Sequence, residues 1–165
     1  EELSDGIVEK IETDVILKRA RLRALHLLED MDRTEAALRE KLKQGCYTQD
    51  MIDRAVDYVK SFGYLDDARY AENFVRSRQG AKSRKEIRAL LMQKGVSSEH
   101  IEQAFEACYA DAGEDEAVRT ILRKKRFDPR TADEPEKQRI YGYLARKGFR
   151  YETVRQVIQN YEDNA

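Results

Sequence analysis

SRKEIRALLMQKG, at residues 83–95, is the stretch that decides the fold, because related stretches occur twice more. These are TEAALREKLKQG at residues 34–45 and EKQRIYGYLARKG at residues 136–148. Each contains an aliphatic residue followed four positions later by leucine: Leu38/Leu42, Ile87/Leu91 and Ile140/Leu144. Residues four apart share one face of a helix, so each pair predicts an apolar stripe. The glycine that ends each stretch predicts a left-handed residue at a helix end.

Two further helices accompany each stretch. After each glycine comes a second apolar stripe: Ile52/Val56/Val59, Ile101/Phe105/Cys108 and Val154/Ile158/Tyr161. Before each stretch a helix is predicted over roughly Val15–Met31, Asp67–Gln79 and Glu114–Arg126. No segment alternates with the two-residue period of a strand. The sequence therefore predicts an all-α protein of three tandem three-helix repeats. Because each repeat needs a neighbour to cover its apolar stripe, we expect them to stack into an elongated, curved body.

Helix signals set the expected boundaries. Repeat 1 covers residues 18–63, repeat 2 covers 64–112 and repeat 3 covers 113–165. The acidic residues 1–17 either extend the first helix or are the remnant of a truncated region, since the chain starts without methionine. Asp32-x-x-Glu35 and Ser83-x-x-Glu86 predict capping boxes, and Pro135 suits a first helical turn. Six glycines are expected at helix ends: Gly45, Gly63, Gly80, Gly95, Gly113 and Gly148.

Composition excludes several classes of protein. The 165 residues are 41% hydrophobic and 38% charged, and they contain no apolar run long enough to cross a membrane. Cys46 and Cys108 are too few and too far apart for a disulfide framework, which favours the reducing cytoplasm. His26 and His100 are isolated, and no nucleotide-binding or metal-binding motif is present. We therefore expect no enzymatic activity, no cofactor and no metal.

The junction between repeats 1 and 2 has the sequence FGYLDDARY, at residues 62–70. Gly63 suits a helix end, Asp66 or Asp67 suits the start of the next helix, and Leu65 suits a staple onto Tyr70. A well-made helix junction explains these residues, and helix capping explains the two aspartates without a divalent ion.

This junction also resembles the signature of the RecX family, which is Gly-Tyr-Leu-Asp-Asp followed by arginine and an aromatic residue. The matching positions are Gly63, Tyr64, Leu65, Asp66, Asp67, Arg69 and Tyr70. The order of the surrounding helices is similar over about residues 18–161. The resemblance implies a small bacterial protein of the cytoplasm that binds filaments of the recombinase RecA. It implies modulation, in the direction of inhibition, of recombination, of ATP turnover and of the co-protease activity of the SOS response. We expect a monomer that contacts DNA through the filament or directly.

Charge is strongly segregated along the chain, although the formal net charge is only −1. Residues 69–95 carry eight basic and two acidic residues, and residues 119–150 carry eleven basic and four acidic residues. Basic bands attract phosphate, and arginine also pairs with carboxylates of a protein partner. The candidates for contact with RecA or DNA are Arg69, Arg76, Arg78, Lys82, Arg84, Lys85, Arg88, Arg123, Lys124, Lys125, Arg126, Lys137, Arg139, Arg146, Lys147 and Arg150.

Two other functions are compatible with this pattern. A helical module that binds DNA without RecA predicts tight, salt-sensitive binding to bare DNA. A helical scaffold for protein partners predicts no dependence on nucleic acid. Tyr70, Phe74 and Tyr143 suit base stacking in principle, but their positions on the helices favour the core.

Overall fold

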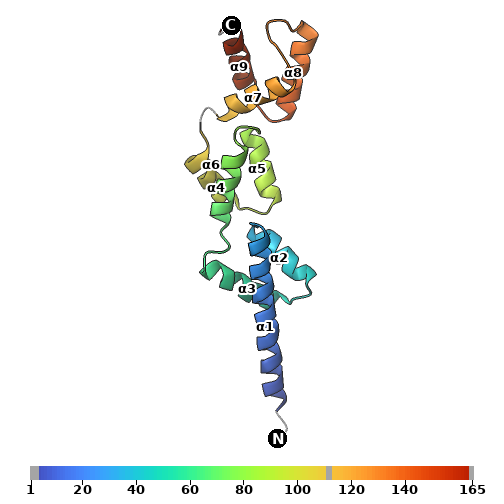
Figure 1. Cartoon of the computed structure of the whole chain (residues 1–165), viewed down its shortest axis with the longest axis vertical. Coiled ribbons are helices and arrows are strands. Elements are labelled where there is room, and N and C mark those ends of the chain that lie inside the picture. Colours follow the sequence, from blue (N-terminus) through green and yellow to red (C-terminus); the bar gives the residue numbers. More distant parts are fainter. Residues whose placement is uncertain (1–3, 111–112, 164–165) are drawn as a thin grey trace. The chain divides into compact units, whose positions relative to one another are not determined.

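The computed structural model describes residues 4–110 and 113–163, and over these residues the chain forms nine α-helices and no strand (Figure 1). Repeat 1 contains α1 (Asp5–Asp30), α2 (Glu35–Gln44) and α3 (Gln49–Ser61). Repeat 2 contains α4 (Asp67–Arg78), α5 (Arg84–Gln93) and α6 (Ser98–Cys108). Repeat 3 contains α7 (Gly113–Lys124), α8 (Glu134–Arg146) and α9 (Tyr151–Asp163). The predicted all-α, tandem-repeat fold is confirmed. None of the described helices is long and apolar enough to cross a membrane.

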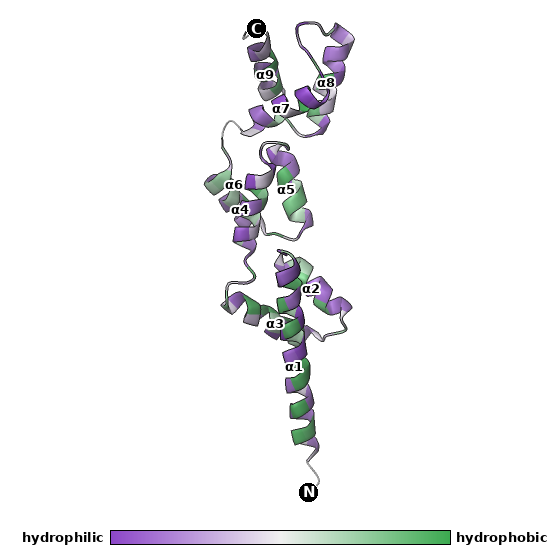
Figure 2. Ribbon diagram, in the orientation of Figure 1, coloured by the Kyte–Doolittle hydropathy of each residue, from purple (hydrophilic) through white to green (hydrophobic). Residues whose placement is uncertain are grey.

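Two compact units make up the chain. The first contains the residues up to Tyr70 together with Lys94–Val96, and the second contains Ala71–Gln93 and the residues from Ser97 onward. Hydrophobic and hydrophilic residues alternate along the helices of both units, as expected for amphipathic helices (Figure 2). The predicted leucine pairs are all buried: Leu38, Leu42, Ile87, Leu91, Ile140 and Leu144 are at most 5% exposed.

Each unit has its own apolar core. In the first unit, Leu38 and Leu42 of α2 pack with Val56 of α3, Ala24 of α1 and Leu65 of the junction. In the second unit, residues of α7, α8 and α9 form one cluster, and α4, α5 and α6 bury residues such as Val75, Ile87 and Phe105. Tyr161, expected in the third stripe, is 37% exposed and lies outside this core.

Helix α1 begins ten residues earlier than expected, at Asp5. The described part of the acidic N-terminal segment therefore extends the first helix, which was one of the two alternatives, while residues 1–3 lie outside the described residues. Ile7, Ile11 and Val15 on this extension are each more than 40% exposed.

The start of α2 corrects one predicted cap. The hydroxyl of Thr34, not the carboxylate of Asp32, accepts a hydrogen bond from an amide of the first turn, that of Ala37. Asp32 lies two residues too early to cap a helix that starts at Glu35. The Glu35 carboxylate instead accepts hydrogen bonds from Arg39 Nε and Lys60 Nζ.

The start of α5 has the predicted cap but a different carboxylate partner. Ser83 Oγ accepts a hydrogen bond from the Glu86 amide, whereas the Glu86 carboxylate accepts one from Lys82 Nζ at 2.6 Å. A complete capping box is found at α8, between Asp133 and Glu136, and Pro135 lies in the first turn as predicted.

Two of the three repeated glycines have the expected left-handed backbone. Gly95 has a φ of 80° and Gly148 a φ of 92°. Gly45, in contrast, has a φ of −79°, and the left-handed residue is its neighbour Cys46, with a φ of 62°. The prediction is therefore displaced by one residue in repeat 1, and a residue with a Cβ adopts a conformation that favours glycine.

Hydrogen bonds hold a glycine turn against a helix start in each unit. In the first unit, Thr34 Oγ1 donates to the carbonyl of Lys94 at 2.7 Å. In the second unit, Ser83 Oγ donates to the carbonyl of Lys147 at 2.6 Å. A Cβ at the glycine that follows each carbonyl would collide, with Ala36 in the first unit and with Ser83 Oγ in the second. These two glycines are therefore required by packing as well as by backbone conformation.

An acidic side chain completes each of these helix starts. In the first unit, Asp67 Oδ1 accepts a hydrogen bond from the Glu35 amide at 2.8 Å. In the second unit, Glu114 Oε1 accepts one from the Arg84 amide at 3.0 Å. Glu114 is only 8% exposed, and the hydrogen bond from this amide offsets part of the cost of removing its carboxylate from water. Both carboxylates also lie at the positive end of a helix dipole.

Candidate functional site

Most residues of the FGYLDDARY junction have a structural role. Gly63 has a φ of 72°, and its carbonyl accepts a hydrogen bond from Arg69 Nη1 at 3.0 Å. Asp66 Oδ1 accepts from the Arg69 amide and so caps α4, while the carboxylate of Asp67 is used at the start of α2. Leu65 is 3% exposed and belongs to the core. Arg69, one of the basic candidates, thus closes the loop that precedes its own helix.

The remaining junction residues are aromatic. Tyr70 is half-buried. Phe62 and Tyr64 are 58% and 53% exposed, and their rings stack on each other with centroids 5.9 Å apart. The capping geometry of the junction requires neither exposed ring.

The basic residues of α5 are divided between internal contacts and solvent. Arg84 and Arg88 both pair with Glu102 of α6, and the Arg84 guanidinium lies 4.6 Å from the ring centroid of Phe105. These two arginines therefore join α5 to α6. Lys85, which lies between them in sequence, is exposed.

The other candidates of the first basic band have partners within their own segment. Arg76 pairs with Glu72 at 3.3 Å, Lys82 pairs with Glu86, and the Arg78 guanidinium lies 5.5 Å from the ring centroid of Phe74. The Arg76–Glu72 pair is exposed and contributes little stability, so Arg76 remains available to a partner at small cost, whereas the Lys82–Glu86 pair is partly buried.

The second basic band forms a cleft in repeat 3, between the loop after α7 and helix α8. The cleft has a volume of about 470 Å³. We call it the basic cleft and define it by Lys125, Arg126, Phe127, Arg139, Tyr143 and Arg146. Arg139, Tyr143 and Arg146 are spaced four and then three residues apart, so they share one face of α8. The fold thus brings together two clusters of cations that are 13 to 21 residues apart in sequence.

Two acidic residues also line the basic cleft, and both are already engaged. Asp128 accepts hydrogen bonds from Nε and Nη2 of Arg130 at 3.0 and 2.9 Å. The Arg130 side chain holds the pKa of Asp128 below its usual range. Glu136 accepts a hydrogen bond from the Asp133 amide in the capping box of α8. In the part of the chain that the structure describes, no ion pair neutralises Lys125, Arg126, Arg139 or Arg146, so the cleft favours an anion.

Tyr143 fixes two of the surrounding charges. Lys125 Nζ lies 4.0 Å from its ring centroid, and Lys147 Nζ lies 5.8 Å from the same centroid. Cation–π contacts of this kind hold an ammonium group in place without neutralising it. A neighbouring hollow of about 300 Å³, lined by Lys85, Arg146 and Lys147 among others, extends the positive surface toward α5.

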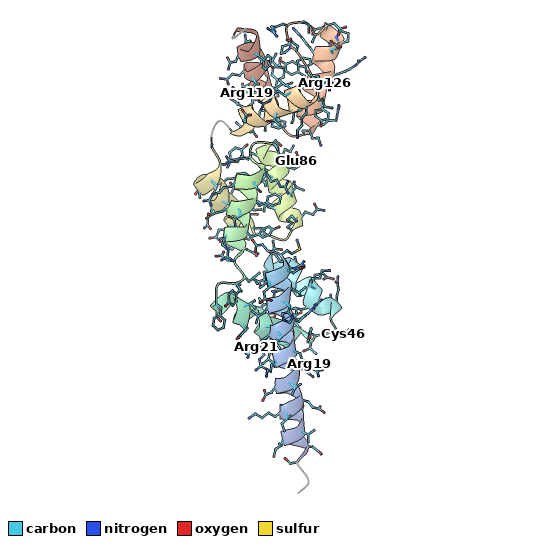
Figure 3. The ribbon with its side chains drawn as sticks, viewed as in Figure 1. Arg19, Arg21, Cys46, Glu86, Arg119 and Arg126 are labelled. Atoms are coloured by element: carbon cyan, nitrogen blue, oxygen red, sulfur yellow. The ribbon has the colours of Figure 1, made fainter. Side chains whose placement is uncertain are left out.

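Arg126 has a φ of 53°, a left-handed conformation that is unfavourable for a side chain with a Cβ. It follows the last turn of α7, where its amide donates to the carbonyl of Arg123 at 3.0 Å, and it is labelled at the end of that helix in Figure 3. The remaining candidates lie outside the cleft. Arg123 pairs with Glu116, and Lys124, Lys137 and Arg150 line neither hollow.

Sequence reasoning identified the cations of the basic cleft but not their convergence, and it assigned Tyr143 to the core. The signal was present in the spacing of residues 139, 143 and 146, which places an aromatic residue between two arginines on one helical face. Over the described residues, no three His, Cys, Asp or Glu side chains cluster in a way that suits a metal ion.

Comparison with known proteins shows one family throughout. The first, second and third three-helix domains of RecX match residues 20–58, 66–104 and 113–158 respectively. A Regulatory protein RecX from Trichlorobacter lovleyi is 36% identical over 142 residues, which is 84% of this chain and 92% of that protein. A Regulatory protein RecX from Clostridium botulinum (strain Eklund 17B) is 32% identical over 150 residues, covering 88% of this chain and 69% of that protein.

Solved structures share the fold. A crystal structure of regulatory protein RecX superposes with a TM-score of 0.82 at 24% identity, over 94% of this chain and 79% of that one. The crystal structure of RecX from Lactobacillus salivarius gives a TM-score of 0.77 at 25% identity, over 88% of this chain and 96% of that one.

Proposed function

The chain belongs to the RecX family of regulatory proteins, and on that basis we propose that it binds filaments of the recombinase RecA and inhibits their activity. The activities concerned are recombination, ATP turnover and co-protease function. The match of all three three-helix domains carries this proposal, because the resemblance covers the whole repeat array and not one helix junction.

The basic cleft supports a contact with DNA as part of this function. Four cations line it and its two acids are engaged elsewhere, so the phosphate backbone is the ligand that its charge best suits. Arginine side chains bind phosphate oxygens through two parallel N–H groups, which favours Arg139 and Arg146 as the principal contacts. A RecA filament presents protein and DNA together, so a regulator with a phosphate-binding cleft is suited to it.

The test is a titration of the protein into pre-formed filaments of RecA, single-stranded DNA and ATP, with ATP hydrolysis as the measurement. Binding to bare DNA at the same salt concentration is measured in parallel. We expect hydrolysis to fall at protein concentrations well below those that coat bare DNA. Unchanged hydrolysis together with tight binding to bare DNA would instead favour a DNA-binding module that acts without RecA.

A paired substitution tests the contribution of the cleft. Arg139→Ala combined with Arg146→Ala removes two cleft charges, and Arg19→Ala combined with Arg23→Ala removes two exposed charges of α1, outside the candidate residues, as a matched control. The cleft variant is expected to need at least 10-fold more protein for the same inhibition, and the control variant less than 3-fold more. Equal effects of the two variants would show that the overall charge, and not the cleft, is responsible.

A further inference from the structure

Two aromatic side chains of the junction have no structural role that explains their position. Phe62 and Tyr64 flank Gly63, yet they are 58% and 53% exposed, whereas Leu65 beside them is buried. Exposed aromatic rings are common at protein interfaces, because they bury a large apolar area with little loss of side-chain freedom. The Phe62 ring contacts the rings of both Tyr64 and Tyr58, at centroid distances of 5.9 and 5.1 Å. The three rings therefore form one preorganised cluster.

This cluster forms one wall of a groove on the first unit. A hollow of about 440 Å³ lies between the rings and Leu25, Leu28 and Glu29 of α1. A second hollow, of about 420 Å³, shares Leu25 and Tyr58 with the first and continues along α1 past Arg21 and Lys18. We call the two together the aromatic groove. All of its residues belong to the first unit, whereas the basic cleft belongs to the second.

Arg21 provides a polar group within this apolar surface. Its guanidinium lies 4.7 Å from the ring centroid of Tyr58. Arg21 is labelled beside α1 in Figure 3. Its Nε atom is buried without a hydrogen-bond partner among the described residues, so a ligand would meet the rest of the guanidinium. Arg21 lines the second hollow, and a carboxylate is the acceptor that a guanidinium binds best. A ligand of the groove is therefore expected to combine apolar side chains with a carboxylate.

The charge of the groove favours protein over nucleic acid. Among the described residues, Glu29 is the charged side chain that lines the aromatic hollow, and no lysine or arginine lines it. Base stacking on aromatic residues normally takes place in a positively charged groove that follows the phosphates, so Glu29 opposes this mode of binding. In the second hollow, Lys18 and Arg21 outnumber Asp14, which matches a carboxylate of a polypeptide.

We propose that the aromatic groove is the docking site for the protein subunit of the filament, specifically for a segment with apolar side chains and at least one aspartate or glutamate. This inference rests on the proposed function and divides it between two surfaces. The aromatic groove of the first unit binds protein, and the basic cleft of the second unit binds phosphate.

The experiment compares three proteins in two binding assays. They are the wild type, Phe62→Ala combined with Tyr64→Ala, and Tyr151→Ala, which removes an aromatic ring that is 66% exposed on the second unit. Binding is measured to immobilised filaments of RecA and single-stranded DNA and, separately, to single-stranded DNA alone. Arg21→Met tests the carboxylate contact in the same assays, and circular dichroism establishes that each variant is folded.

We expect the double variant to lose at least 10-fold in affinity for filaments while its affinity for bare DNA changes less than 2-fold. Arg21→Met is expected to lose about 3- to 10-fold, and Tyr151→Ala is expected to bind as the wild type does. A double variant that binds filaments as tightly as the wild type would overturn the inference and leave the proposed function intact. A parallel loss of bare DNA binding would also overturn it, since the rings would then contact bases. Failure of the wild type to bind filaments would overturn the proposed function, and the inference with it.

Discussion

Arg126→Gly is expected to make the fold more stable and, at the same time, to remove one positive charge from the basic cleft. Arg126 occupies the left-handed region at a φ of 53°, which costs a residue with a Cβ about 1–2 kcal/mol. Glycine avoids that cost but loses about 0.5–1 kcal/mol through the greater freedom of the unfolded chain. The middle values of these two ranges give a net stabilisation of about 0.75 kcal/mol. For a chain of 165 residues this corresponds to a rise in Tm of about 1–4 °C.

Cys46→Gly is the matched control. Cys46 has a φ of 62° at another helix end, after α2 of repeat 1, and it is exposed (Figure 3). The substitution relieves the same backbone conformation but removes no charge. Both variants are expected to raise the Tm by a similar amount. Only Arg126→Gly is expected to weaken binding to single-stranded DNA, and to lower the slope of log affinity against log salt by about 0.7, which corresponds to the loss of one phosphate contact.

Thermal unfolding followed by circular dichroism measures the first effect, and fluorescence anisotropy over a series of salt concentrations measures the second. A fall in Tm for Arg126→Gly would refute the argument from backbone conformation. An unchanged salt slope would show that Arg126 makes no phosphate contact, even though its charge lines the cleft.

Three further substitutions test the packing between helices. Gly95→Ala is expected to lower the free energy of unfolding by at least about 2 kcal/mol, because it combines a φ of 80° with a collision against Ala36. Urea titration measures this free energy. Gly80→Ala, at a position in open space, is the control and is expected to change it little. Glu114→Ala removes the acceptor of the Arg84 amide and is expected to lower the free energy of unfolding by about 1–2 kcal/mol in the same assay. Asp115→Ala is the neighbouring control, and an equal loss of stability in both variants would contradict the capping role. For Glu35, burial opposes ionisation, but hydrogen bonds from Lys60 and Arg39 outweigh it and lower the pKa of the carboxyl. A lowered pKa in the folded state stabilises the protein at neutral pH, and this contribution is lost as the pH falls below about 4.3 and through the folded-state value. Stability measured from pH 7 to pH 3 should therefore fall less steeply for Glu35→Gln than for the wild type, and parallel curves would refute the assignment.

Local signals were enough to predict the helices, but not all of their ends. The Leu38/Leu42 and Ile87/Leu91 pairs identified buried faces correctly, because helical periodicity depends only on residues within one or two turns. The cap at Asp32 was wrong because two candidate side chains lie two residues apart, and the packing of Thr34 against the Lys94 carbonyl selects between them. That contact spans 60 residues, so no local pattern contains it.

The candidate site was predictable as a set of charges but not as a surface. Sequence shows that Arg84, Arg88 and Arg146 are basic, and it contains no signal that Glu102 engages the first two. The order of the helices in space decides which cations converge and which are neutralised. Lys125 and Arg139 thus meet in the basic cleft, whereas Arg84, in an equally basic segment, joins two helices.

The repeats differ in how the first turn of their second helix is satisfied. Helices α2 and α5 each rely on a carboxylate from a later helix, Asp67 or Glu114, to accept a hydrogen bond at their first turn. Helix α8 relies on residues of its own first turn, because the capping box of Asp133 and Glu136 satisfies its start internally. The side of α8 that carries Arg139, Tyr143 and Arg146 is also the wall of the basic cleft. Because the start of this helix is satisfied internally, α8 can present these cations to a ligand without a contact from another repeat at its first turn.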